Sequence, residues 1–319
     1  MGERNFTVKP NERGQTLAAV LKSRLAIPWS AARKIIEQGR VRLSNAICKD
    51  VARRVQAGQH IQVAEKDNRP TRPKPGRSRT DEPLPNIPVR YSDDHIVVVE
   101  KPPGLTTMRH AEEAEEFGER GRRFLPKTLA DLLPRVLMDR KPVLAVHRID
   151  RDTTGLVVFA RTKEAERSLG KQFRAHSIER KYLALVRGRP AEGRIESKLV
   201  HDRGDGRRGS STTGEGQRAV TLVRVVQELG PLTLVECALE TGRTHQVRIH
   251  LGEAAAPLCG EKVYDRPLHG KPAPDPSDAK RVLLHAAYLG LDHPITGQRL
   301  QWFSPLPDDM AEVVERFRK

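Results

Sequence analysis

The stretch "LAVHRIDRDTTGLVVFA", residues 144–160, sets a charged segment between two apolar runs. The apolar runs predict two buried strands joined by a short loop. The second half of this loop, Asp-Thr-Thr-Gly at 152–155, is typical of a tight turn. The core on both sides therefore fixes a loop that carries two carboxylates, Asp150 and Asp152, among basic side chains.

The two aspartates differ in their local surroundings. An aspartate in the first position of a turn accepts a hydrogen bond from a backbone N–H two residues on, so we expect Asp152 to hold the turn. Asp150 follows the apolar Ile149 and has no such partner, and the neighbouring arginines favour its ionised form. Asp150 is therefore the candidate reactive carboxylate. Two aspartates that only balance the arginines would give the same pattern.

The charge of the chain favours a polyanionic partner. Among 319 residues, 57 Lys and Arg against 41 Asp and Glu give a net charge of +16, and the excess is spread along the whole chain. Such an excess most often serves nucleic acid, through neutralisation of phosphates. Aromatic residues make up only 4% of the sequence, which argues against a broad stacking platform but allows a single stacking side chain.

Cysteine, histidine and hydropathy patterns exclude several classes of protein. The cysteines are scattered and form no C-x-x-C motif, and the histidine spacings match no standard zinc site. The first residues lack the apolar core of a signal peptide, and no stretch approaches the roughly 18 apolar residues of a membrane span. We therefore expect a cytoplasmic protein with no disulfide framework, no metal and no membrane partner.

The N-terminal part predicts a small α/β module at residues 1–65. Two segments within 16–38 have helical periodicity, with Thr16 and Ser30 as expected N-caps and Gly39 as an expected C-cap. Short alternating strands follow. The arrangement resembles the αL-type RNA-binding module that also occurs in a small-subunit ribosomal protein and in tyrosyl-tRNA synthetases.

Basic residues of this module are expected to contact RNA. The apolar residues of the second helix share one face, which leaves its basic residues on another. The expected RNA contacts come from this helix and the strand after it: Arg33, Lys34, Arg40 and Arg42. A charged face that is only solvated is the alternative.

Residues 66–88 are rich in proline and arginine and lack periodicity, which predicts a stiff, basic linker. From residue 89 onward, predicted strands outnumber helices, and many of them are adjacent hairpins. We therefore expect an α+β fold for residues 89–319, with a mixed, mainly antiparallel sheet and flanking helices. Long loops are expected at 109–123, 201–218 and 266–281.

The loop of the opening stretch also carries a family resemblance. "HRIDRDTTGL", residues 147–156, resembles the H-R-L-D-x-x-T-S/T-G signature of the RluA family of pseudouridine synthases. Further segments follow the family's order and resemble its other motifs: 91–105, 180–188, 240–251 and 281–291. The resemblance covers about residues 89–319, and an αL-type module before it is common in the family. Ile149 stands where leucine is usual, and Glu261 stands where the family more often has the aspartate of a Gly-Asp pair.

The resemblance implies isomerisation of uridine in RNA without a cofactor. In that reaction the N1 glycosidic bond breaks, uracil rotates, and C5 joins C1′. By resemblance Asp150 is the nucleophile, Tyr182 stacks on the flipped uracil, and Arg248 pairs with Asp150. Pattern alone would also allow a core tyrosine and a solvated helix arginine. The resemblance further assigns RNA contacts to Arg148, Arg243 and Leu284.

Two other functions fit the sequence less well. A non-catalytic RNA-binding or ribosome-assembly factor does not need Asp150, Tyr182 and Arg248 together. A glycoside hydrolase places two carboxyls about 5–9 Å apart across its substrate, which two aspartates in one turn suit poorly. We expect a monomer that acts on large-subunit ribosomal RNA, with tRNA as the alternative substrate. The sequence leaves open which uridine reacts, and whether Asp150 attacks the base, attacks C1′ or deprotonates C2′.

Overall fold

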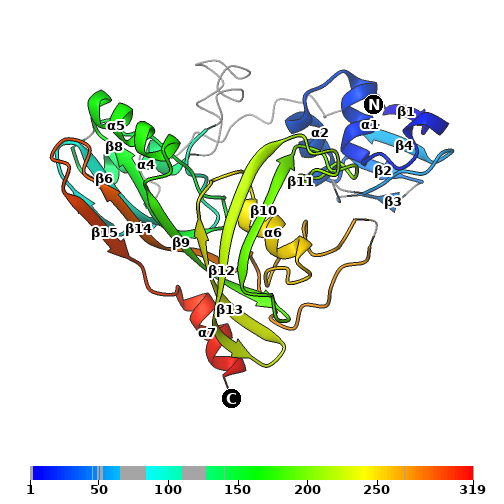
Figure 1. The fold of residues 1–319 in the computed structure, drawn as a ribbon. Coiled ribbons are helices and arrows are strands. Elements are labelled where there is room, and N and C mark those ends of the chain that lie inside the picture. The colour runs from blue at the N-terminus through cyan, green and yellow to red at the C-terminus, as the bar shows by residue number, and fades with distance from the viewer. Residues whose placement is uncertain are drawn as a thin grey trace. The chain divides into compact units, whose positions relative to one another are not determined.

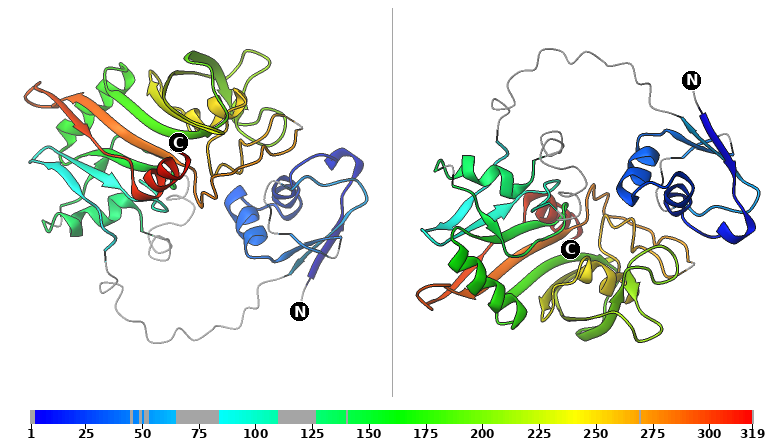
Figure 2. Two further views of the ribbon diagram at one scale, coloured as in Figure 1. Left: turned by 90° about the horizontal axis from the view of Figure 1, so that it is seen from below. Right: turned by 90° about the horizontal axis from the view of Figure 1, so that it is seen from above.

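The protein, seen in a computed structural model, forms two compact units (Figures 1 and 2). The first comprises Met1–Glu82 with Val200–Thr212, and the second comprises Pro83–Leu199 with Thr213–Lys319. The structure describes residues 3–44, 46–48, 50, 53–64, 84–109, 127–139, 141–268 and 270–318. Most of the predicted linker and of the predicted loop at 109–123 lies outside these residues.

The first unit contains a four-stranded antiparallel sheet and is the expected small α/β module. Its strands, in spatial order, are β1 (Glu3–Thr7), β4 (His60–Ala64), β2 (Val41–Leu43) and β3 (Ala46–Ile47). Its helical elements are the short 3-10 helix Pro10–Glu12, α1 (Leu17–Leu25) and α2 (Trp29–Glu37). One hydrophobic cluster joins helices to sheet, and fully buried Leu21, Ile36 and Ile61 belong to it.

Of the two N-caps predicted for the helices of this unit, the structure confirms one and contradicts the other. The Thr16 hydroxyl accepts a hydrogen bond from the backbone N–H of Ala19, so Thr16 is the N-cap of α1, as predicted. Ser30 was predicted to cap α2, and this is wrong. The helix begins at Trp29, because Pro28 has the extended backbone of an N-cap, with φ −64° and ψ 158°.

The second unit is built on one large sheet, which confirms the mixed, mainly antiparallel α+β fold (Figure 1). Eight of its strands run in the order β10, β12, β13, β9, β14, β8, β6, β5, and β15 and β7 pair with β14 and β8. The short strand β11 lies in the segment Val200–Thr212 of the first unit. The strand bounds are β5 (Val89–Ser92), β6 (Ile96–Lys101), β7 (Leu144–Ala145), β8 (Thr154–Ala160), β9 (Glu179–Arg187), β10 (Gly193–Val200), β11 (Gly209–Ser210), β12 (Gln217–Leu229), β13 (Leu232–Leu239), β14 (Leu284–Asp292) and β15 (Arg299–Phe303). β8 and β14 pair in parallel, and the other pairs that form this unit's described ladders are antiparallel.

The opening stretch supplies β7 and β8, the two strands that its apolar runs predict. At the start of β8, Gly155 has φ +108°, and a Cβ there would lie 2.3 Å from the carbonyl oxygen of Ala286. A side chain at this position would therefore push β8 away from β14. The glycine of the Asp-Thr-Thr-Gly turn is thus required by strand pairing.

Helices flank this sheet, with α5 against β8 and α6 against β12 (Figure 1). They are α4 (Leu129–Val136), α5 (Lys163–Arg174), α6 (Gln246–Glu253) and α7 (Asp308–Phe317). α6 begins at Gln246, directly after His245. The Gln246 side chain accepts hydrogen bonds from the Thr241 hydroxyl and the Arg243 backbone N–H, and these bonds hold the preceding turn outside the helix.

One large hydrophobic cluster connects the loop of the opening stretch to the sheet and to α6. Ile149, Tyr182, Val247 and Leu284 all belong to it and are all less than 9% exposed. The side chains that precede and follow these residues are thereby fixed relative to one another. Among the described residues, no helix is long and apolar enough to span a membrane.

Candidate active site

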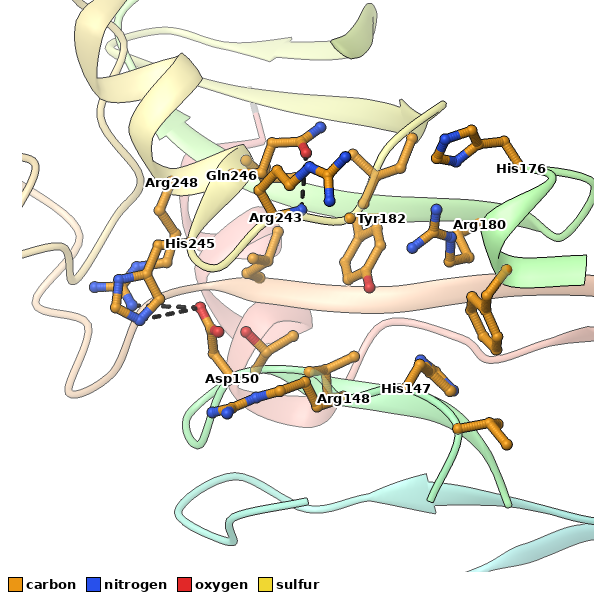
Figure 3. Close-up of a pocket in the computed structure, with 18 of the residues that line it drawn as sticks. His147, Arg148, Asp150, His176, Arg180, Tyr182, Arg243, His245, Gln246 and Arg248 are labelled. Atoms are coloured by element: carbon orange, nitrogen blue, oxygen red, sulfur yellow. Dashed lines mark hydrogen bonds and ion pairs between the residues drawn. The ribbon is translucent and has the colours of Figure 1, made fainter. Parts of the chain in front are cut away.

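A pocket of about 410 Å³ opens where the loop of the opening stretch faces β9 and the start of α6 (Figure 3). This volume lies within the range of small-molecule sites. All site residues predicted in the second unit line it: Arg148, Asp150, Tyr182, Arg243, Arg248 and Leu284. Asp150 is the one carboxylate among the described residues that line this pocket.

Asp150 faces the guanidinium of Arg248 across the pocket. Its Oδ2 lies 3.4 Å from Arg248 Nη1 and 3.9 Å from His245 Nε2 (Figure 3). Arg248 also donates from Nε and Nη2 to the Glu261 carboxylate, at 2.7 and 2.9 Å. Arg248 is therefore oriented by Glu261 and offers its remaining nitrogen to Asp150.

Glu261, which stands where the resemblance leads one to expect an aspartate, is 3% exposed. Its Oε1 also accepts hydrogen bonds from the backbone N–H groups of Val263 and Tyr264. Burial opposes its ionisation, but the hydrogen bonds from Arg248 and the backbone outweigh burial and lower the pKa of Glu261. Burial likewise opposes the Arg248 cation, but Glu261 and Asp150 raise the pKa of Arg248 above its usual value.

Tyr182 lies on β9 in the wall of the pocket, between Asp150 and Arg180 (Figure 3). It is 8% exposed, and Leu284, 4% exposed, is in the same hydrophobic cluster. Burial raises the pKa of Tyr182, so its hydroxyl is protonated at neutral pH and its ring offers an apolar face.

The turn after Asp150 is held differently from the prediction. The Asp152 carboxylate is exposed and accepts no hydrogen bond from the described residues, so the expected bond to the backbone is not formed. Lys101 Nζ donates to the Arg151 carbonyl at 2.7 Å, and Arg281 donates to the Asp152 carbonyl at 3.1 Å. The carbonyl groups of the turn point toward Lys101 and Arg281, and the Asp152 side chain points into solvent.

Comparison with known proteins gives two family matches and several relatives that align over almost the whole chain. Residues 95–253 match the RNA pseudouridylate synthase family, and residues 15–61 match the S4 domain. The ribosomal large subunit pseudouridine synthase D of Nitrosomonas europaea is 34% identical, over 98% of this chain and 87% of that protein. The protein of that name from Haemophilus influenzae is 32% identical, over 98% and 94%. The chain belongs to the RNA pseudouridine synthase family.

A solved structure supports the same fold. Human RNA pseudouridylate synthase domain containing 4 aligns with a TM-score of 0.56 and 23% identity, over 72% of this chain and 92% of that one. As a pseudouridine synthase with an S4 domain, the protein is an RNA-binding isomerase.

The predicted RNA contacts of this pseudouridine synthase lie in both units. Arg148 is exposed at the pocket, and Arg243 donates to the Arg218 carbonyl at 3.0 Å. In the first unit, Lys34 and Arg42 are exposed. Two basic residues there have partners within the unit, since Arg33 pairs with Glu37 and Arg40 donates to the Ala64 carbonyl.

The sequence analysis did not predict that Arg180, His147 and His176 also line the pocket of this pseudouridine synthase. A signal for Arg180 was present, because it lies two residues before Tyr182 on the same strand and so projects from the same face. No group of described residues has the composition of a metal site.

Proposed function

We propose that this protein converts uridine to pseudouridine in large-subunit ribosomal RNA, with Asp150 as the nucleophile. The observation that carries this proposal is the placement of Asp150 opposite Tyr182 in one pocket, with Arg248 3.4 Å from the carboxylate. Relatives named ribosomal large subunit pseudouridine synthase D, 32–34% identical over almost the whole chain, support the substrate.

The reaction needs a carboxylate beside the sugar or base and no external donor of atoms. The N1–C1′ bond breaks, uracil turns, C5 bonds to C1′, the hydrogen on C5 leaves as a proton, and N1 takes up a proton, so that the composition is unchanged. Asp150 acts on the nucleotide and is released when the new carbon–carbon bond forms. Arg248, already fixed by Glu261, supplies positive charge next to this carboxylate throughout.

The rest of the pocket suits a flipped uridine. The protonated Tyr182 ring gives a stacking surface, and Leu284 gives an apolar contact beside it. Arg148, exposed next to Asp150, fills the gap left by the flipped base or holds a phosphate. Lys34 and Arg42 of the first unit, with Arg33 and Arg40, contribute phosphate contacts elsewhere on the RNA.

Pocket composition argues against the glycoside hydrolase. That chemistry needs a second carboxyl across the substrate, whereas Asp150 is the one acid among the described lining residues and Glu261 is committed to Arg248. A pure binding protein would not need a carboxylate paired with an arginine inside a pocket. The proposal includes a monomeric enzyme that works in the cytoplasm.

The test is to map pseudouridines in total RNA from cells with and without this protein, and from cells that carry Asp150→Asn. We expect the loss of specific pseudouridines in large-subunit ribosomal RNA in both altered strains. Loss of pseudouridines from tRNA alone would show that tRNA, and not ribosomal RNA, is the substrate. An unchanged map, or released sugar, would contradict the proposal, and sedimentation of the purified protein checks the monomer.

A further inference from the structure

The end of the pocket opposite Asp150 holds a second set of nitrogen-bearing side chains (Figure 3). Arg180, His176 and His147 lie there, whereas Asp150, His245 and Arg248 lie at the other end, with Tyr182 between them. Phe173 completes this set, which we call the Arg180 cluster: His147, Phe173, His176 and Arg180.

Among the described residues, Arg180 has no counter-ion. Within the described part of the chain its guanidinium makes no hydrogen bond or ion pair, and its Nε is buried without a partner. Its contacts are with the Phe173 ring, 5.6 Å away, and with Gly242, where a Cβ would lie 2.4 Å from Nη1. Burial lowers the pKa of Arg180, because a cation removed from water without a counter-ion is destabilised.

His147 adds a second donor to the same place. Its Nε2 accepts a hydrogen bond from the Val158 backbone N–H at 3.0 Å, so in the neutral ring Nδ1 carries the hydrogen. Burial, and then the charge of Arg180, lower the pKa of His147 to about 3, so the ring is neutral at physiological pH. Stacking on Phe173, with centroids 4.7 Å apart, fixes the ring.

We propose that the Arg180 cluster is an anion subsite that binds a phosphodiester group adjacent to the flipped uridine. This proposal rests on the proposed function. Among the described residues, the buried Nε of Arg180 has no hydrogen-bond partner, and the neutral His147 ring has Nδ1–H left as a donor because its Nε2 accepts from Val158. A phosphate meets both requirements, because it neutralises the guanidinium and accepts several hydrogen bonds at once. A uracil carbonyl is neutral and would leave the buried charge uncompensated.

The subsite would convert phosphate binding into base extraction. Flipping a base out of its stack is unfavourable, and contacts made only in the flipped state offset this cost. Because Arg180 and Tyr182 project from the same face of β9, a phosphate on the first places the base near the second. Arg180 is therefore a positioning residue for the uracil that faces Asp150.

The first experiment measures RNA binding against salt, with a transcript of large-subunit ribosomal RNA as the probe. Arg180→Gln should reduce the magnitude of the salt slope by about 0.7–0.9 units, the value for one lost phosphate contact. Arg180→Lys should keep the slope because it keeps the charge. The matched control is Arg189→Gln, which removes an arginine that is 67% exposed, pairs with Glu228 and does not line the pocket.

An unchanged slope in Arg180→Gln overturns the proposal, as does an equal change in Arg189→Gln. Binding is read without turnover, so this result is separate from the proposed function. Failure of the function would appear as parent protein that binds RNA and forms no pseudouridine.

The second experiment identifies the phosphate. A hairpin RNA modified by the parent protein is made with one uncharged methylphosphonate on either side of the target uridine. One of the two positions should slow the parent about 10- to 100-fold at subsaturating protein, the range for a lost charged hydrogen bond. Arg180→Gln should react with this methylphosphonate RNA as fast as it reacts with the unmodified hairpin. Additive losses would indicate a contact with uracil and would overturn the phosphate assignment.

A second variant guards against misfolding of Arg180→Gln, which thermal unfolding would reveal. Gly242→Ala keeps the arginine but places a methyl group against its Nη1. It should also lose sensitivity to the methylphosphonate. Full sensitivity in a folded Gly242→Ala protein whose affinity matches the parent would contradict the geometry of the subsite.

Discussion

Lys101 Nζ donates a hydrogen bond of 2.7 Å to the carbonyl oxygen of Arg151, the residue that directly follows Asp150. The same ammonium group donates to the Pro102 carbonyl at 2.8 Å. Lys101 is 1% exposed at the end of β6. One side chain thus ties the loop that carries Asp150 to a neighbouring strand of the sheet.

Replacement of Lys101 should therefore affect the chemical step more than RNA affinity. Lys101→Met keeps the aliphatic stem but leaves the Arg151 carbonyl without its donor, so Asp150 loses its fixed position. We expect the single-turnover rate to fall about tenfold or more, with the dissociation constant for RNA changed less than about twofold. Lys163→Met is the control, since Lys163 is 69% exposed on α5. Equal rates for parent and Lys101→Met would contradict the role of this lysine.

The same residue should give the protein a distinctive pH dependence of stability. Burial lowers the pKa of Lys101 from 10.5 to about 7, so between these values the unfolded chain binds more protons than the folded protein. The free energy of unfolding should then rise with pH across this window, by at most about 1.4 kcal/mol per pH unit. Urea unfolding at pH 7 to 9.5 would show this rise in the parent relative to Lys101→Met. A constant difference would be the contrary outcome.

The sequence predicted elements and motifs better than it predicted the contacts between them. The loop of the opening stretch, Tyr182 on a strand and Arg248 on a helix all follow from local patterns or from motif resemblance. The bond from Lys101 to Arg151 joins residues 50 positions apart, and local turn chemistry assigned the same task to Asp152. Tertiary contacts overrode that local preference, and nothing local indicates that Arg180 lacks a counter-ion among the described residues.

Glu261 should act through Arg248. Glu261→Gln keeps the shape but removes the charge that orients the guanidinium, so Arg248 is drawn toward Asp150. We expect a lower reaction rate and about 1–3 kcal/mol less stability at neutral pH. Because the pKa of Glu261 is lowered from 4.5, the stability it contributes is present above pH 4.5 and lost as pH falls through its folded value. Unfolding curves that differ equally at pH 3 and pH 7 would contradict this.

Tyr182 should act by stacking. Tyr182→Phe keeps the ring, whereas Tyr182→Ala removes a contact worth roughly 1–3 kcal/mol per base. We expect Phe to match the parent in RNA binding, and Ala to lose both rate and flipped-base occupancy. Fluorescence of 2-aminopurine beside the target uridine reports the flipping step. Equal flipping by Tyr182→Ala would assign this tyrosine to the core alone.

The first unit should supply affinity and leave the chemistry alone. Lys34 and Arg42 are exposed, so the double change to glutamine removes charge without loss of a packed contact. Arg40 is left in place because its guanidinium holds the Ala64 carbonyl. We expect the salt slope of RNA binding to fall by up to about two units. The single-turnover rate at saturating protein should not change, and a slope equal to that of the parent would remove the RNA-binding role from this surface.

Asp150 and Asp152 form a natural pair for a test of the nucleophile, since they lie two residues apart in one loop. The Asp150 carboxylate faces Arg248 in the pocket. The Asp152 carboxylate is exposed to solvent and accepts no hydrogen bond from the described residues. Asp150→Asn is nearly isosteric but cannot act as a carboxylate, so it should fold, bind RNA and release no tritium from 5-³H-uridine RNA. Asp152→Asn should keep most of the activity, because Lys101 and Arg281 hold the backbone of the turn. Tritium release at the parent rate by Asp150→Asn, or its loss in Asp152→Asn alone, would show that the nucleophile is assigned to the wrong residue.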